Sequence, residues 1–120
     1  MGGQYHRNIH IIEQNKIFRE SLKTALNQIP DFDIVSDSDN TDCFENLGDK
    51  QIQLILIDNN LTKSKCSDIK NKALALWPSV RFLLLINYKK EECNIDLNRP
   101  VKAILKNSSK KDFENRIREL

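Results

Sequence analysis

Three residues that could do chemistry each stand directly after a short, mostly aliphatic run. Glu13, Asp58 and Lys106 are these residues, and Asp58 ends the run Leu54–Ile57. An acid at the end of a buried run is costly unless it meets a partner. Two acids and a lysine brought together could hold a cation and an anionic group, or could satisfy one another as an ion pair.

Elements that would position these residues alternate along the chain. Runs with strand character occur at Ile9–Ile12, Phe32–Val35, Leu54–Ile57, Phe82–Ile86 and Val101–Leu105. Helical apolar patterns lie between them, at about Lys16–Gln28, around Phe44, across Ile69–Trp77 and after Ser109. Short, continuously apolar strands that alternate with helices are typical of a parallel sheet covered on both faces.

We therefore predict an α/β fold with a doubly wound, five-stranded parallel sheet in the order 2-1-3-4-5. This order makes the first and third strands neighbours, so Glu13 and Asp58 would meet, with Lys106 facing them. Ligands of open parallel sheets bind at the carboxyl ends of the strands. The segment Tyr88–Pro100 is polar and ends in proline, so a fourth helix there should be short or irregular.

The first and last helices should each present an apolar face. In the first, this face comprises Ile17, Phe18, Leu22, Ala25, Leu26 and Ile29. Ser109 lies three residues before Asp112, a pattern typical of a helix start, and Phe113 and Ile117 follow on one face.

Composition limits the class of protein. A chain of 120 residues fits one domain, and 19 basic against 17 acidic residues give a net charge of +2 without a basic block. Three widely spaced cysteines favour a reducing cytoplasm over a disulfide framework. No apolar run approaches the roughly 18 residues of a membrane span. We expect residues 1–7 to be a disordered tail or a cloning remnant, and residues 8–120 to be the domain.

Three motifs resemble the receiver domain of bacterial two-component response regulators, with its flavodoxin-like fold. These are IIEQNKIFRESL (Ile11–Leu22), LILIDNNL (Leu54–Leu61) and AILKNSS (Ala103–Ser109), and the resemblance extends over Asn8–Leu120. It is strongest to receivers of helix-turn-helix transcription factors. The resemblance implies that Asp58 is the phosphoacceptor position and that Lys106 pairs with the acyl phosphate. It also implies that Glu13, Asp58 and Asn60 hold Mg²⁺.

The same comparison shows departures from the family pattern. Gln14 stands where the second acid of the metal site would be, and Ile86 stands where a Ser or Thr would sense the phosphoryl group. Ala103 stands at the aromatic switch position. We therefore expect a degenerate site, weak or absent Mg²⁺, and an atypical, phosphorylation-independent receiver that acts as a regulatory interaction module and not as an enzyme.

The partner implied by the resemblance is a histidine kinase or another signalling protein. A homodimer is a further expectation, with contacts from Lys102, Lys110, Phe113 and Ile117. DNA would be bound only through an output domain that these residues do not include, and no membrane partner is expected.

Three alternatives stay open. The domain could be a working phospho-receiver that accepts phosphate at Asp58 from a histidine kinase. It could be a flavodoxin-like cofactor-binding domain or small enzyme, although Gln14–Ile17 is not a glycine-rich phosphate loop. Asp58 and Lys106 could also form a purely structural ion pair.

Overall fold

The computed structural model describes residues 6–39, 44, 47, 49–97 and 101–120. Its centre is a parallel sheet of five strands in the order β2-β1-β3-β4-β5, as predicted. The strands are β1 (Arg7–Ile12), β2 (Phe32–Ser38), β3 (Leu54–Asp58), β4 (Arg81–Ile86) and β5 (Lys102–Leu105). The register pairs Ile12 with Ile57, and Asp58 with Leu85, so the strands end together at one edge.

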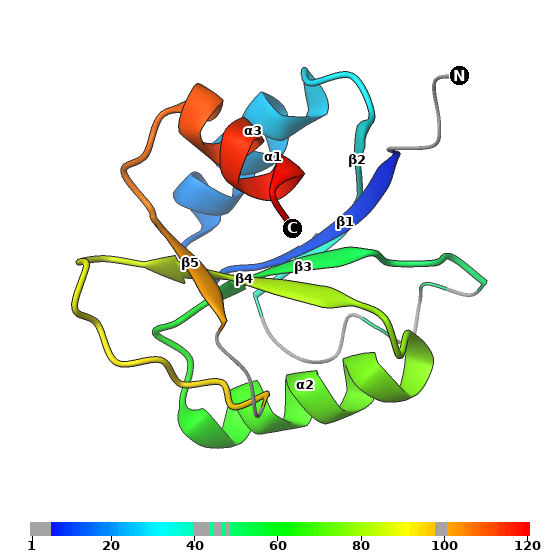
Figure 1. Cartoon of the computed structure of the whole chain (residues 1–120), viewed down its shortest axis with the longest axis vertical. Coiled ribbons are helices and arrows are strands. Elements are labelled where there is room, and N and C mark those ends of the chain that lie inside the picture. The colour runs from blue at the N-terminus through cyan, green and yellow to red at the C-terminus, as the bar shows by residue number, and fades with distance from the viewer. Residues whose placement is uncertain (1–5, 40–43, 45–46, 48, 98–100) are drawn as a thin grey trace.

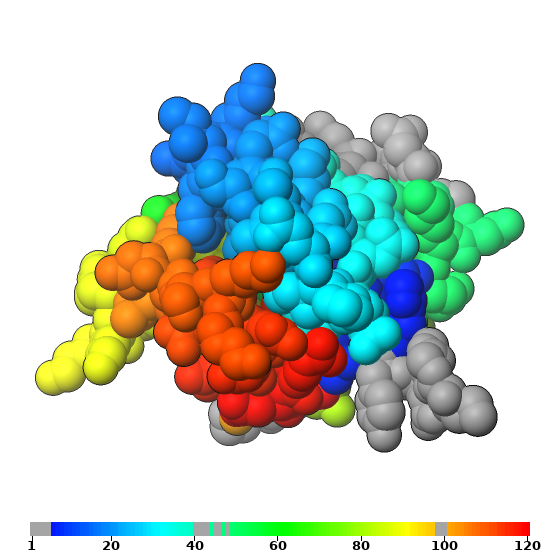
Figure 2. Space-filling model, turned by 90° about the horizontal axis from the view of Figure 1, so that it is seen from above, coloured from blue at the N-terminus to red at the C-terminus, as the bar shows by residue number. Residues whose placement is uncertain are grey.

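Helices cover the two faces of the sheet unequally in the described residues. Helices α1 (Lys16–Asn27) and α3 (Lys110–Arg118) lie side by side on one face, and α2 (Lys63–Leu76) lies on the other (Figure 1). Seen from above, α1 and α3 form a continuous layer over the sheet (Figure 2). Residues 87–97, which follow β4, lie on the same side of the sheet as α2 (Figure 1).

Each helix begins with a capping side chain in the loop that leaves the preceding strand. Asn15 accepts a hydrogen bond from the amide of Phe18 at 3.0 Å, and Thr62 accepts one from the amide of Lys65 at 3.2 Å. Ser109 caps α3 in the same way, as its position before Asp112 predicted. These caps satisfy amides that a helix start leaves unpaired, so each helix begins just beyond a strand end.

The core consists of two apolar layers, one on each face of the sheet. Alternate residues of β3 belong to different layers: Leu54 and Leu56 face α1 and α3, whereas Ile55 and Ile57 face α2. All four side chains are at most 2% exposed. Burial on both sides explains why the strand is apolar at every position.

Some sequence predictions need correction. Strand β2 does not end at Val35 but continues through Ser38, because its polar end pairs with His10–Ile12 beyond an irregularity in the register. Ile17 is not part of the buried face of α1; it lies in the first turn of the helix and is 81% exposed. Arg7 pairs with Phe32 in the sheet, inside the range expected to be a tail, and residues 1–5 lie outside the described residues.

The linking segments also differ from regular helices. No helix is present between Asn87 and Leu97, in agreement with the prediction of a short or irregular fourth helix. Of the helix expected around Phe44, most residues lie outside the described part of the chain; Phe44 and Leu47 are described, and both are buried in the α2-side layer. In the described ranges no helix is both long and apolar enough to cross a membrane.

Candidate functional site

A polar hollow of about 610 Å³ lies at the carboxyl ends of β1, β3 and β5. Its lining comprises Glu13, Gln14, Asn15, Phe18, Asp58, Asn60, Asn87, Lys106 and Asn107. The strand order places it: β1 and β3 are neighbours, so residues that directly follow them meet at the same edge. This is where a doubly wound sheet binds its ligands.

Lys106 joins the two acids at the centre of this hollow. Its Nζ lies 2.8 Å from Oδ1 of Asp58 and 3.0 Å from Oε1 of Glu13. Both carboxylate side chains are 1% exposed, whereas that of Lys106 is 16% exposed. The contact with Asp58 is a hydrogen bond, but the contact with Glu13 lacks hydrogen-bond geometry and is an ion pair only.

Local backbone groups hold the two acids in place. The amide of Asn60 donates to Oδ1 of Asp58 at 2.9 Å, and the amide of Asn15 donates to Oε2 of Glu13 at 2.9 Å. Gln14 approaches Oδ2 of Asp58 through its backbone amide at 3.4 Å and through its side-chain amide at 3.3 Å. Gln14, which the sequence comparison set at the position of a second acid, therefore turns its N–H groups toward Asp58.

The environment shifts the pKa values of Glu13 and Asp58 in opposite directions. Burial raises the pKa of Glu13 above its ordinary value, and the hydrogen bond from the Asn15 amide and the ion pair with Lys106 offset this only in part. Burial also opposes ionisation of Asp58, but the hydrogen bonds from Lys106 and the Asn60 amide outweigh it, so the pKa of Asp58 is lowered. Asp58 is thus the stronger acid of the pair, and Lys106 is chiefly its counterion.

Burial opposes the charge of Lys106 too, but its hydrogen bond to Asp58 and its ion pair with Glu13 reverse the effect and raise its pKa. Lys106 therefore carries its positive charge at neutral pH. One cation between two buried acids leaves at most one unbalanced negative charge in the hollow.

The residues expected to hold Mg²⁺ fit that ion poorly. Mg²⁺ prefers oxygen ligands in near-ideal octahedral geometry. Here Lys106 already occupies one oxygen of each acid, and Asn60 and Gln14 present N–H groups to Asp58. In the described residues no group of three or more His, Cys, Asp or Glu side chains is arranged to hold a metal ion.

The two residues expected at switch positions, Ile86 and Ala103, lie in the sheet close to this hollow. Ile86 ends β4 and is 7% exposed, packed in the α2-side layer, and the amide of Lys106 donates to its carbonyl at 2.8 Å. Ala103 lies on β5 against the same layer. Neither side chain can form a hydrogen bond; Ile86 is buried in the core, whereas Ala103 is only partly buried.

Sequence patterns missed several polar residues that shape the surroundings. Arg19 donates to the backbone carbonyl of Glu13 at 2.6 Å and to Asp37 at 3.0 Å, which fixes the end of β1. Asn59, directly after Asp58, is only 2% exposed, and its partners are Glu91, Glu92 and Asn94 on the link between β4 and β5. The one signal available in the sequence was an amide placed immediately after a buried strand.

Comparison with known proteins identifies the class of fold. No protein-family model matches the chain, and no curated protein matches it. Among solved structures, it is similar to RcsB in dimers bound to two parallel DNAs, with 16% identity and a TM-score of 0.73, covering 93% of this chain and 62% of that one. It is also similar to a LuxR-family DNA-binding response regulator from Staphylococcus aureus, with 18% identity, a TM-score of 0.67, and coverage of 94% and 97%.

The isolated REC domain of RcsB from Salmonella enterica serovar Typhimurium, in the presence of the phosphomimetic BeF₃⁻, is similar as well. Its identity is 15% and its TM-score 0.65, with 92% of this chain and 84% of that one covered. The chain therefore has the flavodoxin-like receiver fold of response regulators. It spans less than two thirds of the RcsB chain in the DNA complex.

Proposed function

We propose that the chain is an atypical receiver domain that regulates a partner by protein contact, without a phosphoryl switch and without enzymatic turnover. By this proposal it works in the cytoplasm, where the thiols of Cys66 and Cys93, both free in the structure, would stay reduced. The receiver fold supports the general class. The side chains at the ends of the strands support regulation without a phosphoryl switch.

One observation carries the proposal: Lys106 bridges Asp58 and Glu13 while Ile86 occupies the sensor position. A phosphoryl group on Asp58 can shift a conformational equilibrium only through contacts that differ between the two states. Ile86 offers no hydroxyl for such a contact and is already buried, and Ala103 has no ring to move. A phosphoryl group on Asp58 would therefore shift the conformational equilibrium of the domain very little.

The proposal is tested by adding beryllofluoride with Mg²⁺ and measuring the mass of the protein in solution by sedimentation. We expect no change in mass and no chemical-shift change in the amides of β4 and β5. A saturable shift in either would mean that the switch operates, and it would overturn the proposal.

A working phospho-receiver is the second candidate, and the hollow itself favours it. The space beside Asp58 is about 610 Å³, and Lys106 and the Asn60 amide already bind one carboxylate oxygen, as they would bind a phosphoryl oxygen. Labelling with acetyl phosphate separates the two candidates. Stable incorporation at Asp58, absent in Asp58→Asn, would favour phosphate acceptance from a histidine kinase.

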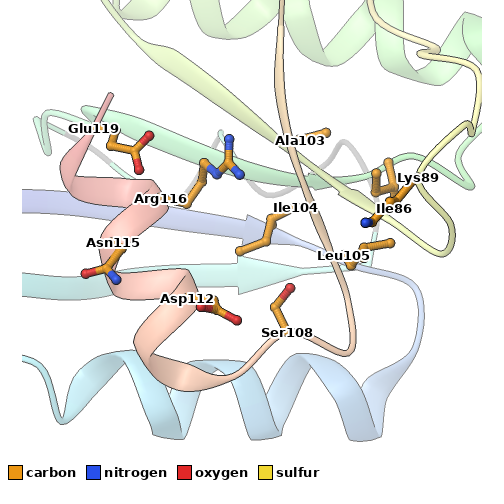
Figure 3. Close-up of a pocket in the computed structure, with 10 residues that line it drawn as sticks. All are labelled: Ile86, Lys89, Ala103, Ile104, Leu105, Ser108, Asp112, Asn115, Arg116 and Glu119. Carbon is orange, nitrogen blue, oxygen red and sulfur yellow. The ribbon is translucent and has the colours of Figure 1, made fainter.

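The partner surface that we propose is the groove beside β5. It has a volume of about 570 Å³, and Figure 3 shows it between β5 and α3, with Ala103 and Ile104 on opposite sides of the strand. Lys89 and Arg116 contribute positive charge to it, and Asp112 and Glu119 contribute negative charge. Such a mixed groove suits a signalling protein or a second copy of the chain.

Two of the residues expected at this surface are unsuitable. Phe113 and Ile117 are 3% and 0% exposed and pack in the core under α3, so the expectation that they contact a partner is wrong. Lys102 and Lys110 are exposed and remain candidates. DNA binding, which is stated for the RcsB complex, would require an output domain outside these residues.

A further inference from the structure

The segment 87–97, here called the strap, follows β4 and forms neither a helix nor a strand. Most of its residues are exposed, but it is anchored to the α2 side of the sheet: Ile95 is 4% exposed and belongs to the α2-side layer, and Lys70 of α2 donates to the carbonyl of Asp96 at 2.7 Å. Figure 1 shows the strap running from the end of β4 down to α2. An irregular segment needs specific bonds to hold such a position, since it has no internal ladder of its own.

Asn59 supplies those bonds from the loop after Asp58. Its side-chain amide donates at 2.7 Å both to Oε2 of Glu91 and to the carbonyl of Glu92. Its side-chain oxygen accepts from the amide of Asn94 at 2.9 Å, and its carbonyl accepts from the side chain of Asn94 at 2.9 Å. A side chain that is 2% exposed thus has every polar group satisfied by the strap.

Glu91 closes the network on the β4 side. Its Oε1 accepts from the amide of Asn87 at 2.9 Å, directly after β4, while its Oε2 accepts from Asn59. The side chain of Asn87 in turn donates to that of Asn60 at 3.1 Å. One carboxylate therefore ties together the turn after β4 and the loop after β3. Hydrogen bonds to an ionised acceptor are roughly twice as strong as neutral ones.

We propose that this network is a built-in latch, in which Glu91 and Asn94 grip Asn59 and hold the turn after β4 in one conformation regardless of the state of Asp58. The two loops that it joins border the polar hollow, through Asn60 after β3 and Asn87 after β4. The resident carboxylate of Glu91 fixes them without any added anion. This inference goes beyond the proposed function, because none of the latch bonds includes Asp58 or Lys106.

The latch also defines how the strap could be released. A partner or ligand that captured the carboxylate of Glu91 would leave the Asn59 amide without one of its two acceptors at a buried position. A buried amide that loses an acceptor is costly, so the remaining bonds to Glu92 and Asn94 would weaken. Release of the strap would then uncover Ile95 and the adjoining face of α2.

The test is amide hydrogen exchange measured by NMR on the full chain in three variants. Glu91→Ala removes both acceptors, Glu92→Ala is the matched control because that side chain is 83% exposed, and Asp58→Asn alters the hollow alone. The informative reporter is the amide of Asn94, whose own acceptor, Asn59, is unchanged in all three.

We expect Glu91→Ala to speed exchange at Asn94 by at least about tenfold, the factor that corresponds to about 1.4 kcal/mol, while amides in β1 and β3 stay unchanged. Glu92→Ala and Asp58→Asn should alter it by less than about twofold. Equal exchange rates at the amide of Asn94 in Glu91→Ala and Glu92→Ala would overturn the proposal that Glu91 holds the strap. Faster exchange in Asp58→Asn, matching that of Glu91→Ala, would overturn its independence from the acceptor site.

If Glu91→Ala fails to fold, Glu91→Gln replaces it, since glutamine keeps one acceptor oxygen and loses the charge. That variant should speed exchange at Asn94 by a smaller factor, of at least about threefold, and no change would overturn the proposal. A beryllofluoride response with an intact latch would contradict only the proposed function, so the two failures are distinguishable.

Discussion

Replacement of Lys106 by alanine is the sharpest test of whether this lysine neutralises the buried charges of Asp58 and Glu13. The substitution leaves Asp58 and Glu13, each 1% exposed, without the cation that both contact. Removal of one partner from a buried ion pair costs about 3–5 kcal/mol, because an uncompensated charge remains in a poorly solvated place. We expect a loss in this range in the free energy of unfolding at pH 7.

The matched control is Lys63→Ala. Lys63 also faces a carboxylate, with its Nζ 3.5 Å from Oε1 of Glu92, but its side chain is 70% exposed and that of Glu92 is 83% exposed. An ion pair in water is worth about 0–1 kcal/mol. Urea denaturation monitored by Trp77 fluorescence gives both values, with similar m-values in the two variants as the check on two-state behaviour.

The pH dependence gives the same experiment a second readout. Without Lys106, the pKa values of both buried acids should rise, so protons bind more readily to the folded variant. The destabilisation relative to the wild type should therefore be full at neutral pH and should shrink toward about pH 4, near the ordinary pKa of a carboxyl group. Asp58→Asn, combined with Lys106→Ala, should recover about 1–3 kcal/mol, since one uncompensated charge is gone.

If Lys106→Ala were no more destabilising than Lys63→Ala, the reasoning would be refuted. Such a result would mean that water reaches both acids and that the ion pair contributes no more than a surface contact. A destabilisation that grew on acidification would refute the assigned signs of the pKa shifts.

Three further outcomes are expected. Mg²⁺ titration followed by NMR should show little saturable change at millimolar concentration, and Gln14→Asp should strengthen whatever binding exists; tight binding by the wild type would contradict the poor fit of the site. The absorbance spectrum of the purified protein should contain no cofactor band, and a flavin-like band would revive the cofactor-binding alternative. Burial lowers the pKa of His10 to about 4, so its imidazole should not titrate above about pH 5 and the domain should lose stability as pH falls from about 6.5 toward 4; titration near 6.5 would contradict this.

The sheet and the central triad were predictable from sequence because they depend on patterns that repeat along the chain. Apolar runs with turn residues between them define strands, and parallel topology then brings the residues after the first, third and fifth runs to one edge. Glu13, Asp58 and Lys106 follow from that logic alone. Their distances did not, since an ammonium that contacts both acids depends on side-chain geometry.

The details that sequence patterns missed depend on neighbours distant in the chain. Ile17 was assigned to the apolar face of α1, but at about 100° per residue it lies well off the stripe that contains Leu22 and Leu26, and its side chain is 81% exposed. The end of β2 is polar and pairs at the edge of the sheet, where burial does not mark the strand. The partners of Asn59 lie more than thirty positions away, in a segment with no periodic pattern.

The strap and a regular helix are held in position by different kinds of contact. Where a regular helix covers a sheet, its position follows from an apolar stripe that many substitutions preserve. The strap has no such stripe, and its position depends on a few directed bonds to one buried amide. The proposed absence of a phosphoryl switch and the proposed latch after β4 are therefore physically consistent, since a turn that does not respond to an anion on Asp58 can be held by the carboxylate of Glu91. In that case the conformation of this region reports the integrity of Glu91 and Asn59, and not the chemical state of Asp58.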